Sequence, residues 1–221
     1  MAFNSGGDLF VSSIGDNSIR KFSSTGEDLG LFVSLFGIGC PIDLAVDRSG
    51  NLLVADICIT VVLKFSPTVQ DLGFFAMTGL SNPKGLAFDS AGNLFVSNTT
   101  SNTIRKFSPT GQDLGIFASG LQFPGGVVID LSGNLYVASS NGIRKFSATG
   151  EDLGNFPLPL GPEFVVIAFP TFAGIPRTPN CHGNSVFTLV HQFGGLNAAA
   201  STLDFPDVKS LQQAIRALCG R

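Results

Sequence analysis

Carboxylate, amide and amine side chains recur in the polar segments that separate the short apolar runs of this 221-residue chain. Their oxygens suit a hard cation such as Ca²⁺, and Asp16, Asp56 and Asn98 are the candidate donors. We favour the competing interpretation, in which Asp and Asn only form loop turns, so no cofactor is expected. The full set of candidate ligand-binding residues is Asp16, Asp56, Asn98, Asn102, Asn141 and Lys84.

The four cysteines are candidates for disulfides. None lies in a CxxC pair, so a zinc site of the usual spacing is not expected. Cys181 and Cys219 bracket the C-terminal segment, and a bridge between them would add about 2–4 kcal/mol of stability; two free buried thiols are the alternative. Cys40 and Cys58 fall in connections that open on the same side of the repeat described below, but their pairing depends on a geometry that the sequence leaves open.

Catalytic motifs are missing from the sequence. It contains no Gly-x-Ser-x-Gly elbow, no P-loop and no His-Glu-x-x-His motif. Its two histidines, His182 and His191, lie in a tail for which helices are predicted, and a lone helical histidine is more often a surface or capping residue. No catalytic residue is therefore predicted.

The composition is that of a folded chain. Hydrophobic residues make up 44% and charged residues 13%, which excludes a disordered chain and a coiled coil. No apolar run reaches about 18 residues, so no transmembrane helix is expected. The net charge of −3 offers no basic field for nucleic acid. The pairs Arg20-Lys21, Arg105-Lys106 and Arg144-Lys145 are interpreted as solvated outer-strand charges, with RNA binding as the alternative.

Four copies of one segment make up most of the sequence. The copies begin at Ala2, Leu44, Leu86 and Val127. The residue before the second apolar run of each copy is Asp8, Asn51, Asn93 or Asn134, in steps of 43, 42 and 41 residues. A period of this size indicates a repeat architecture.

Each copy is predicted to form four short antiparallel strands. In the third copy these are Leu86–Phe88, Leu94–Ser97, Thr103–Phe107 and Leu114–Ala118. Four strands in about 42 residues match one blade of a β-propeller. A sheet packed between two others must be apolar on both faces, which explains why Ile104 and Phe107 lie three residues apart. We therefore predict an all-β propeller; a β-solenoid, whose repeats are usually shorter, is the alternative.

The repeat carries the pattern D-x-x-G-N-hydrophobic-x-V at Asp47–Val54, Asp89–Val96 and Asp130–Val137. This pattern resembles the NHL-repeat family and its relatives, the gluconolactonase-like and streptogramin-lyase-like propellers, over about residues 1–160. The resemblance implies a propeller fold. It carries over no site, because the lyase-like acid–base histidine has no counterpart in the repeats. The repeat glutamates, Glu27 and Glu151, lie on the face opposite to the gluconolactonase-like metal site.

The copies define the expected domains. Blades are predicted at about 1–40, 41–82, 83–123 and 124–162, followed by an extra strand at 164–169, a linker at 170–180 and an α-helical module at 181–221. The four blades either close as a small ring or are a piece of a larger one. We favour the piece, whose open sheet edges would allow self-association.

These features favour a non-catalytic binding or scaffold protein for a protein or small-molecule ligand. The alternative is a metal-dependent lactonase-like hydrolase or a streptogramin-lyase-like enzyme in a longer form. An exported bacterial protein, extracellular or periplasmic, is expected, although this chain carries no signal peptide. Neither nucleic acid nor a membrane span is expected.

Overall fold

The computed structural model describes residues 1–35, 39–156, 162 and 209. The chain divides into two compact units, Met1–Ile167 and Ala168–Arg221, and all the described strands belong to the first. The strand predicted at 164–169 and the linker at 170–180 lie outside the described residues. So do the helical module at 181–221, apart from Lys209, and the Cys181–Cys219 pair.

The described part of the first unit folds into four four-stranded antiparallel sheets. Each sheet is a meander, in which strands follow one another in chain order. The strands are β1 (Ala2–Phe3), β2 (Leu9–Ser13), β3 (Ser18–Phe22), β4 (Asp28–Ser34), β5 (Pro41–Val46), β6 (Leu52–Asp56), β7 (Val61–Phe65), β8 (Asp71–Ala76), β9 (Pro83–Phe88), β10 (Leu94–Asn98), β11 (Thr103–Phe107), β12 (Asp113–Ala118), β13 (Val127–Ile129), β14 (Leu135–Ser139), β15 (Gly142–Phe146) and β16 (Asp152–Phe156).

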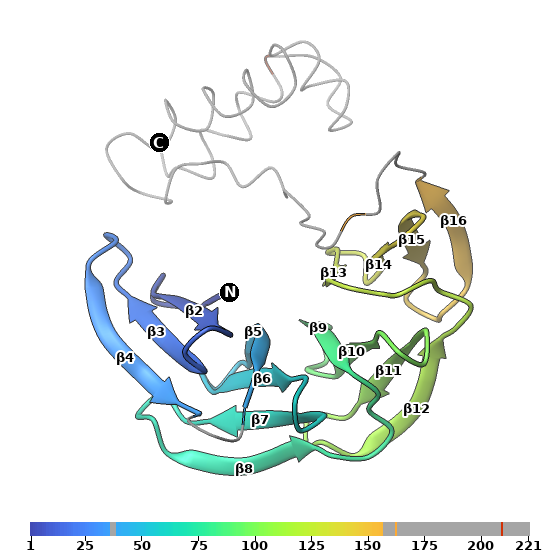
Figure 1. Ribbon diagram of the computed structural model, residues 1–221. Helices are drawn as coiled ribbons and strands as arrows, with labels where there is room; N and C mark the ends of the chain where they lie inside the picture. Colours follow the sequence, from blue (N-terminus) through green and yellow to red (C-terminus); the bar gives the residue numbers. More distant parts are fainter. Residues whose placement is uncertain (36–38, 157–161, 163–208, 210–221) are drawn as a thin grey trace. The chain divides into compact units, whose positions relative to one another are not determined.

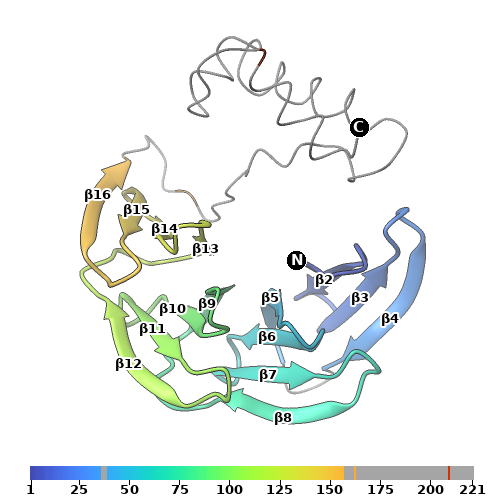
Figure 2. The same ribbon diagram turned by 180° about the vertical axis from the view of Figure 1, so that it is seen from behind.

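The sheets pack face to face in sequence order within this unit (Figure 1). From the front and from behind, the fourth strand of each sheet lies on the outer side of the unit (Figure 2). The predicted all-β fold of four-stranded antiparallel repeats is confirmed. Within residues 1–35 and 39–156, no helix has the length and apolar character needed to span a bilayer.

The second sheet shows why the repeat is apolar without strict alternation. All five residues of β6 are buried. Leu52 and Val54 belong to the core shared with the first sheet, whereas Leu53 and Ala55 belong to the core shared with the third. A strand between two neighbours buries both of its faces, so each of these positions is apolar.

Ile104 and Phe107 of β11 lie in different cores, as predicted. Ile104 packs toward the fourth sheet and Phe107 toward the second. Strand β9 is longer than predicted and begins at Pro83. The first residue of a strand tolerates a proline, because the missing N–H donor is not needed there.

The turn between the first and second strands depends on an aspartate–asparagine pair. In the second sheet the Asp47 carboxylate accepts the backbone N–H of Asn51 at 2.9 Å and the Nζ of Lys64 at 2.9 Å. Burial alone would raise the pKa of Asp47, but these bonds outweigh it and hold the pKa below its ordinary value. In the first sheet the two residue types exchange places, as Asn4 and Asp8, so each described turn keeps one carboxylate.

A bulge bends the start of every fourth strand, where each copy reads Asp-Leu-Gly. In β12 the Asp113 carboxylate accepts the backbone N–H of Gly115 at 2.8 Å, and Gly115 has a φ of 96°. The pairing register with β11 shifts beside this point. Glycine is required because an L side chain rarely adopts this backbone conformation.

Candidate functional site

Two sets of connections lie at one end of the sheets, and we call this end the loop face. It comprises the loops after each second strand (14–17, 57–60, 99–102 and 140–141) and the described connections before each first strand (39–40, 77–82 and 119–126). Backbone hydrogen bonds join the two sets, such as Ile57 N–H to the Cys40 carbonyl at 3.3 Å and Ser140 N–H to the Gln122 carbonyl at 2.9 Å. All six candidate residues lie on this face or close to it.

Asp56, at the end of β6, is fully buried. One carboxylate oxygen accepts the backbone N–H of Cys40 at 2.9 Å, and the other accepts those of Cys58 at 3.0 Å and Ile59 at 3.1 Å. A disulfide joins Cys40 and Cys58, whose Cα atoms lie 5.3 Å apart. This bridge, which the sequence left open, ties the same two connections together. Asp56 therefore acts as a structural clamp.

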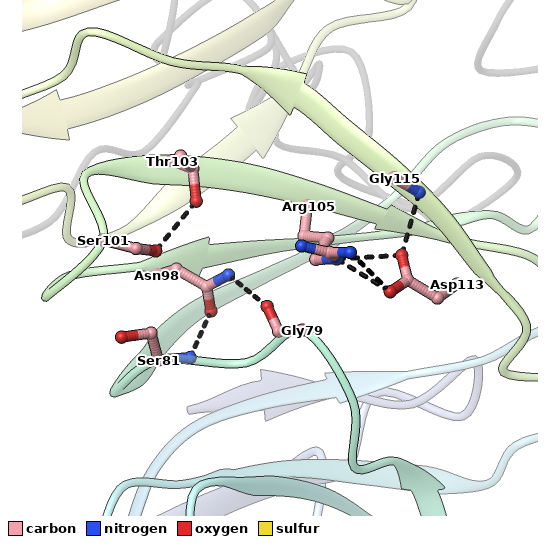
Figure 3. Close-up of polar contacts among 8 residues, drawn as sticks. All are labelled: Gly79, Ser81, Asn98, Ser101, Thr103, Arg105, Asp113 and Gly115. Atoms are coloured by element: carbon pink, nitrogen blue, oxygen red, sulfur yellow. Dashed lines mark hydrogen bonds and ion pairs between the residues drawn. The ribbon is translucent and has the colours of Figure 1, made fainter.

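Asn98 occupies the equivalent position at the end of β10 and is also fully buried. Its side-chain oxygen accepts the N–H of Ser81 at 3.1 Å, and its Nδ2 donates to the carbonyl of Gly79 at 2.9 Å (Figure 3). The amide thus fastens the incoming connection to β10 just as the carboxylate does in the second sheet. Ser139 has this position in the fourth sheet, where its buried hydroxyl has no hydrogen-bond partner among the residues that the structure describes.

Asn102 and Asn141 immediately precede the third strands of their sheets. Asn102 has a positive φ of 56° and accepts the backbone N–H of Phe123 at 2.9 Å. Asparagine tolerates this conformation better than most residues. Asn141 is exposed, and its carbonyl accepts the Nδ2 of Asn155 at 3.1 Å.

Asp16 and Lys84 are placed differently. Asp16 is exposed and accepts the hydroxyl of Ser18 at 2.8 Å. Hydrogen bonds from Ser13 and then Ser18 lower the pKa of the Asp16 carboxyl. Lys84 lies half-buried on the first strand of the third sheet, β9.

The candidate calcium donors do not form one cluster. Asp16, Asp56 and Asn98 each bond within the loops of their own sheet. Within residues 1–35 and 39–156, no three His, Cys, Asp or Glu side chains gather closely enough to hold a metal ion. The polar atoms of Asp56 and Asn98 hold the backbone in place, which agrees with the loop-turn interpretation.

Asp43 is a residue that the sequence analysis missed. It lies on the first strand of the second sheet, and its carboxylate accepts the N–H of Leu86 in the next sheet at 3.0 Å. The amino group of Met1 lies 3.7 Å from its other oxygen. Burial raises the pKa of Asp43 despite these contacts. A single acid inside the apolar strand Pro41–Val46 was the available signal.

The arginines of the repeated basic pairs are bound to aspartates of the neighbouring fourth strands. Arg105 pairs with Asp113 at 2.7 Å (Figure 3), and Arg20 pairs with Asp28 at 2.6 Å. The hydrogen bond from Arg105 is the main cause that lowers the pKa of Asp113. In the second sheet Leu63 replaces the arginine and is buried. In the first and third sheets the arginine is thus held by a carboxylate of its own sheet.

No protein-family model matches the sequence, and no curated protein matches it. Several solved structures of β-propellers are similar to this chain. A gluconolactonase from Xanthomonas campestris is 25% identical with a TM-score of 0.63, over 73% of this chain and 62% of that one. A protein assigned as a gluconolactonase is 19% identical with a TM-score of 0.68, over 77% and 67%. A streptogramin B lyase is 16% identical with a TM-score of 0.61, over 72% and 53%.

The chain has the fold of the gluconolactonase-like and streptogramin-lyase-like β-propellers. The resemblance that the repeat pattern predicted is thereby confirmed as a likeness of fold. The chain spans between 53% and 67% of the length of these three proteins.

Proposed function

We propose that this chain is a non-catalytic binding protein that holds a protein ligand on the loop face. The supporting observation is that four of its loops and connections each expose a large apolar side chain. They are Ile14, Ile59, Met77 and Phe123, with exposed fractions from 38% to 67%. Methionine and aromatic residues are enriched at protein interfaces, and exposed apolar residues gathered on one surface mark interaction sites.

Two of the loops that carry these side chains are fastened by bonds to other parts of their own sheets. Ile59 follows the Cys40–Cys58 disulfide and donates its N–H to Asp56. Phe123 donates its N–H to the side chain of Asn102. A surface that is already ordered loses less conformational entropy when a ligand binds. The polar atoms that the sequence offered for chemistry thus support a preorganised binding surface.

Peptide selection tests this proposal. The immobilised chain is screened against a displayed random-peptide library, and enriched peptides are measured on the double variant Ile59→Ser/Phe123→Ser and on Leu131→Ser. Leu131 is 92% exposed in the β13–β14 turn, on the opposite face, so it is a matched control. We expect enriched peptides to lose at least about tenfold in affinity on the double variant and to keep it on Leu131→Ser.

Two results would contradict the proposal: no enriched peptide, or equal binding to the parent and the double variant. Exposed apolar-to-serine changes shift stability by about 0.5 kcal/mol or less, so misfolding does not confuse the comparison. A thermal unfolding curve for each variant checks this directly.

A second candidate function is that of a lactonase-like or streptogramin-lyase-like enzyme. It is favoured by the fold likeness and by Asp43, a half-buried carboxyl with a raised pKa, since carboxyls with a raised pKa cluster at catalytic sites. Lactone hydrolysis and streptogramin B cleavage, each assayed with added divalent metal, test it. Activity lost in Asp43→Asn but kept in Asp16→Asn would support the enzyme, whereas no activity in the parent would reject it for this chain.

A further inference from the structure

A groove of about 310 Å³ lies between the second and third sheets, at the end opposite to the loop face. Its walls come from the turns after β5, β9 and β11 and from the strands beside them. The residues used below are Arg48, Lys64, Phe75, Phe88, Asp89 and Pro109. Its volume falls at the lower end of the range for small-molecule sites, about 300–1,000 Å³.

The repeats explain why this space is open. In the first sheet the rings of Phe10 and Phe32 meet edge to face at 4.8 Å, and in the third sheet Phe95 and Phe117 do the same at 4.8 Å. The second sheet has Leu53 where the others have Phe10 and Phe95. A smaller side chain therefore stands beside Phe75, which has no such ring partner among the described residues and lines the groove instead.

One of the cations around the groove has no carboxylate partner in the described part of the chain. Lys64 pairs with Asp47 at 2.9 Å, and Asp89 pairs with Lys106 at 3.4 Å. Arg48 donates to the backbone carbonyl of Ser90 in the next sheet and forms no ion pair with any described residue. This bond holds the guanidinium across the gap between the two sheets.

The arginine is peculiar to this interface. The positions equivalent to Arg48 in the other three copies are Ser5, Ser90 and Leu131, so the turn itself does not require an arginine. Arg48 is exposed, so the fold gains little from burying its stem. One interface thus combines a missing ring contact with an added cation.

We propose that this groove binds a small organic anion, made of a carboxylate on a flat apolar body. The Arg48 guanidinium presents donors in the fork geometry that a carboxylate accepts. Phe75, Phe88 and Pro109 supply apolar surface for the body, and Lys64 lies over the Phe75 ring at 5.4 Å, which closes one side. The volume limits the body to about one ring with a short substituent. This site is independent of the protein ligand proposed for the loop face.

Benzoate, benzamide and acetate are suitable probes, because they separate the charge from the ring. Titrations followed by heteronuclear NMR on the parent chain should give saturable shifts for benzoate at groove residues, with a dissociation constant on the order of 1 mM. Benzamide lacks the charge and acetate lacks the ring, so each should bind about tenfold more weakly. Added salt should weaken benzoate more than benzamide.

Two variants localise the effect. Arg48→Gln should lower benzoate affinity about tenfold and remove the preference over benzamide. Arg20→Gln removes the same charge from an exposed arginine of the first sheet and should leave both affinities unchanged. Spectra of the free variants confirm that the fold is retained.

The proposal is overturned if benzoate gives no saturable shifts at the groove, if benzamide binds as tightly as benzoate, or if Arg48→Gln and Arg20→Gln behave alike. Loss of peptide binding on the loop face would leave these titrations unaffected, so the two proposals fail separately.

Discussion

Replacing Asp56 by alanine tests whether this carboxylate is a clamp or a ligand-binding group. The substitution leaves the backbone N–H groups of Cys40, Cys58 and Ile59 without their acceptor. It also empties the space beside Gly39. The Asp56 carboxylate packs closely against this glycine, because a Cβ added to Gly39 would lie 2.5 Å from a carboxylate oxygen. The disulfide holds both connections near their places, so they cannot move far to find new partners.

The size of the effect follows from the burial of the three donors. Cys40 is half-buried, and its orphaned N–H costs about 1–3 kcal/mol. Cys58 and Ile59 are exposed and recover water, so each loses an ordinary hydrogen bond of about 0.5–1.5 kcal/mol. We expect Asp56→Ala to lower the free energy of unfolding by about 3 kcal/mol. Asp56→Asn copies the third sheet at Asn98 and should cost about 1 kcal/mol.

The assay is urea unfolding followed by far-UV circular dichroism, because the chain has no tryptophan. A lower midpoint with an unchanged slope reports lost stability. Asp16→Ala, at an exposed carboxylate, is the control and should shift the free energy by about 0.5 kcal/mol or less. If Asp56→Ala shifts the midpoint no more than this control, the clamp assignment is wrong and Asp56 is again a candidate ligand-binding residue.

Three further predictions concern the same unit and use the same unfolding assay. Replacing Cys40 and Cys58 by serine should lower the free energy of unfolding by about 3 kcal/mol, given the separation of 18 residues. An equal urea midpoint for the parent chain with and without reductant would contradict this prediction. Gly115→Ala should cost about 1–3 kcal/mol through backbone strain alone, because nothing lies within 4 Å of the added Cβ; a neutral result would contradict the bulge argument. Arg105 lowers the pKa of Asp113 in the folded state. The Asp113 carboxylate therefore contributes to the free energy of unfolding above the ordinary pKa of 3.8, and this contribution is lost as the pH falls through the lower folded pKa. Asp113→Asn should therefore flatten the acid limb of the stability curve, and an unchanged limb would refute this.

The period and the apolar runs were enough to predict the sheets. They place a strand at Thr103–Phe107, where the structure has β11 with the same bounds. They also assign Ile104 and Phe107 to opposite faces, because side chains three apart on a strand cannot share one. A sheet that packs between two others needs apolar side chains on both faces, so this burial can be recognised in the sequence.

The roles of the polar loop residues could not be predicted in the same way. Asp56 ends strand β6 and Asp16 lies in the loop after β2; one is fully buried under three N–H donors and the other is exposed. The difference arises from the path of the incoming connection, which composition does not encode. Asp43 was missed for a related reason, since its partner, Leu86, lies 43 residues away in the next sheet.

The repeats supply an internal comparison that separates structural substitutions from functional ones. Leu63 departs from the arginine of the other copies, and the core shared by the first two sheets contains it together with Leu35; packing therefore explains this exchange. Arg48 also departs from the other copies, but it is exposed and has only a backbone carbonyl as partner. A substitution that packing compensates requires no ligand, whereas Arg48 is exposed beside an open groove, and its one hydrogen bond in the described part of the chain goes to a backbone carbonyl of the next sheet. For this reason we propose a ligand site at Arg48 and none at Leu63.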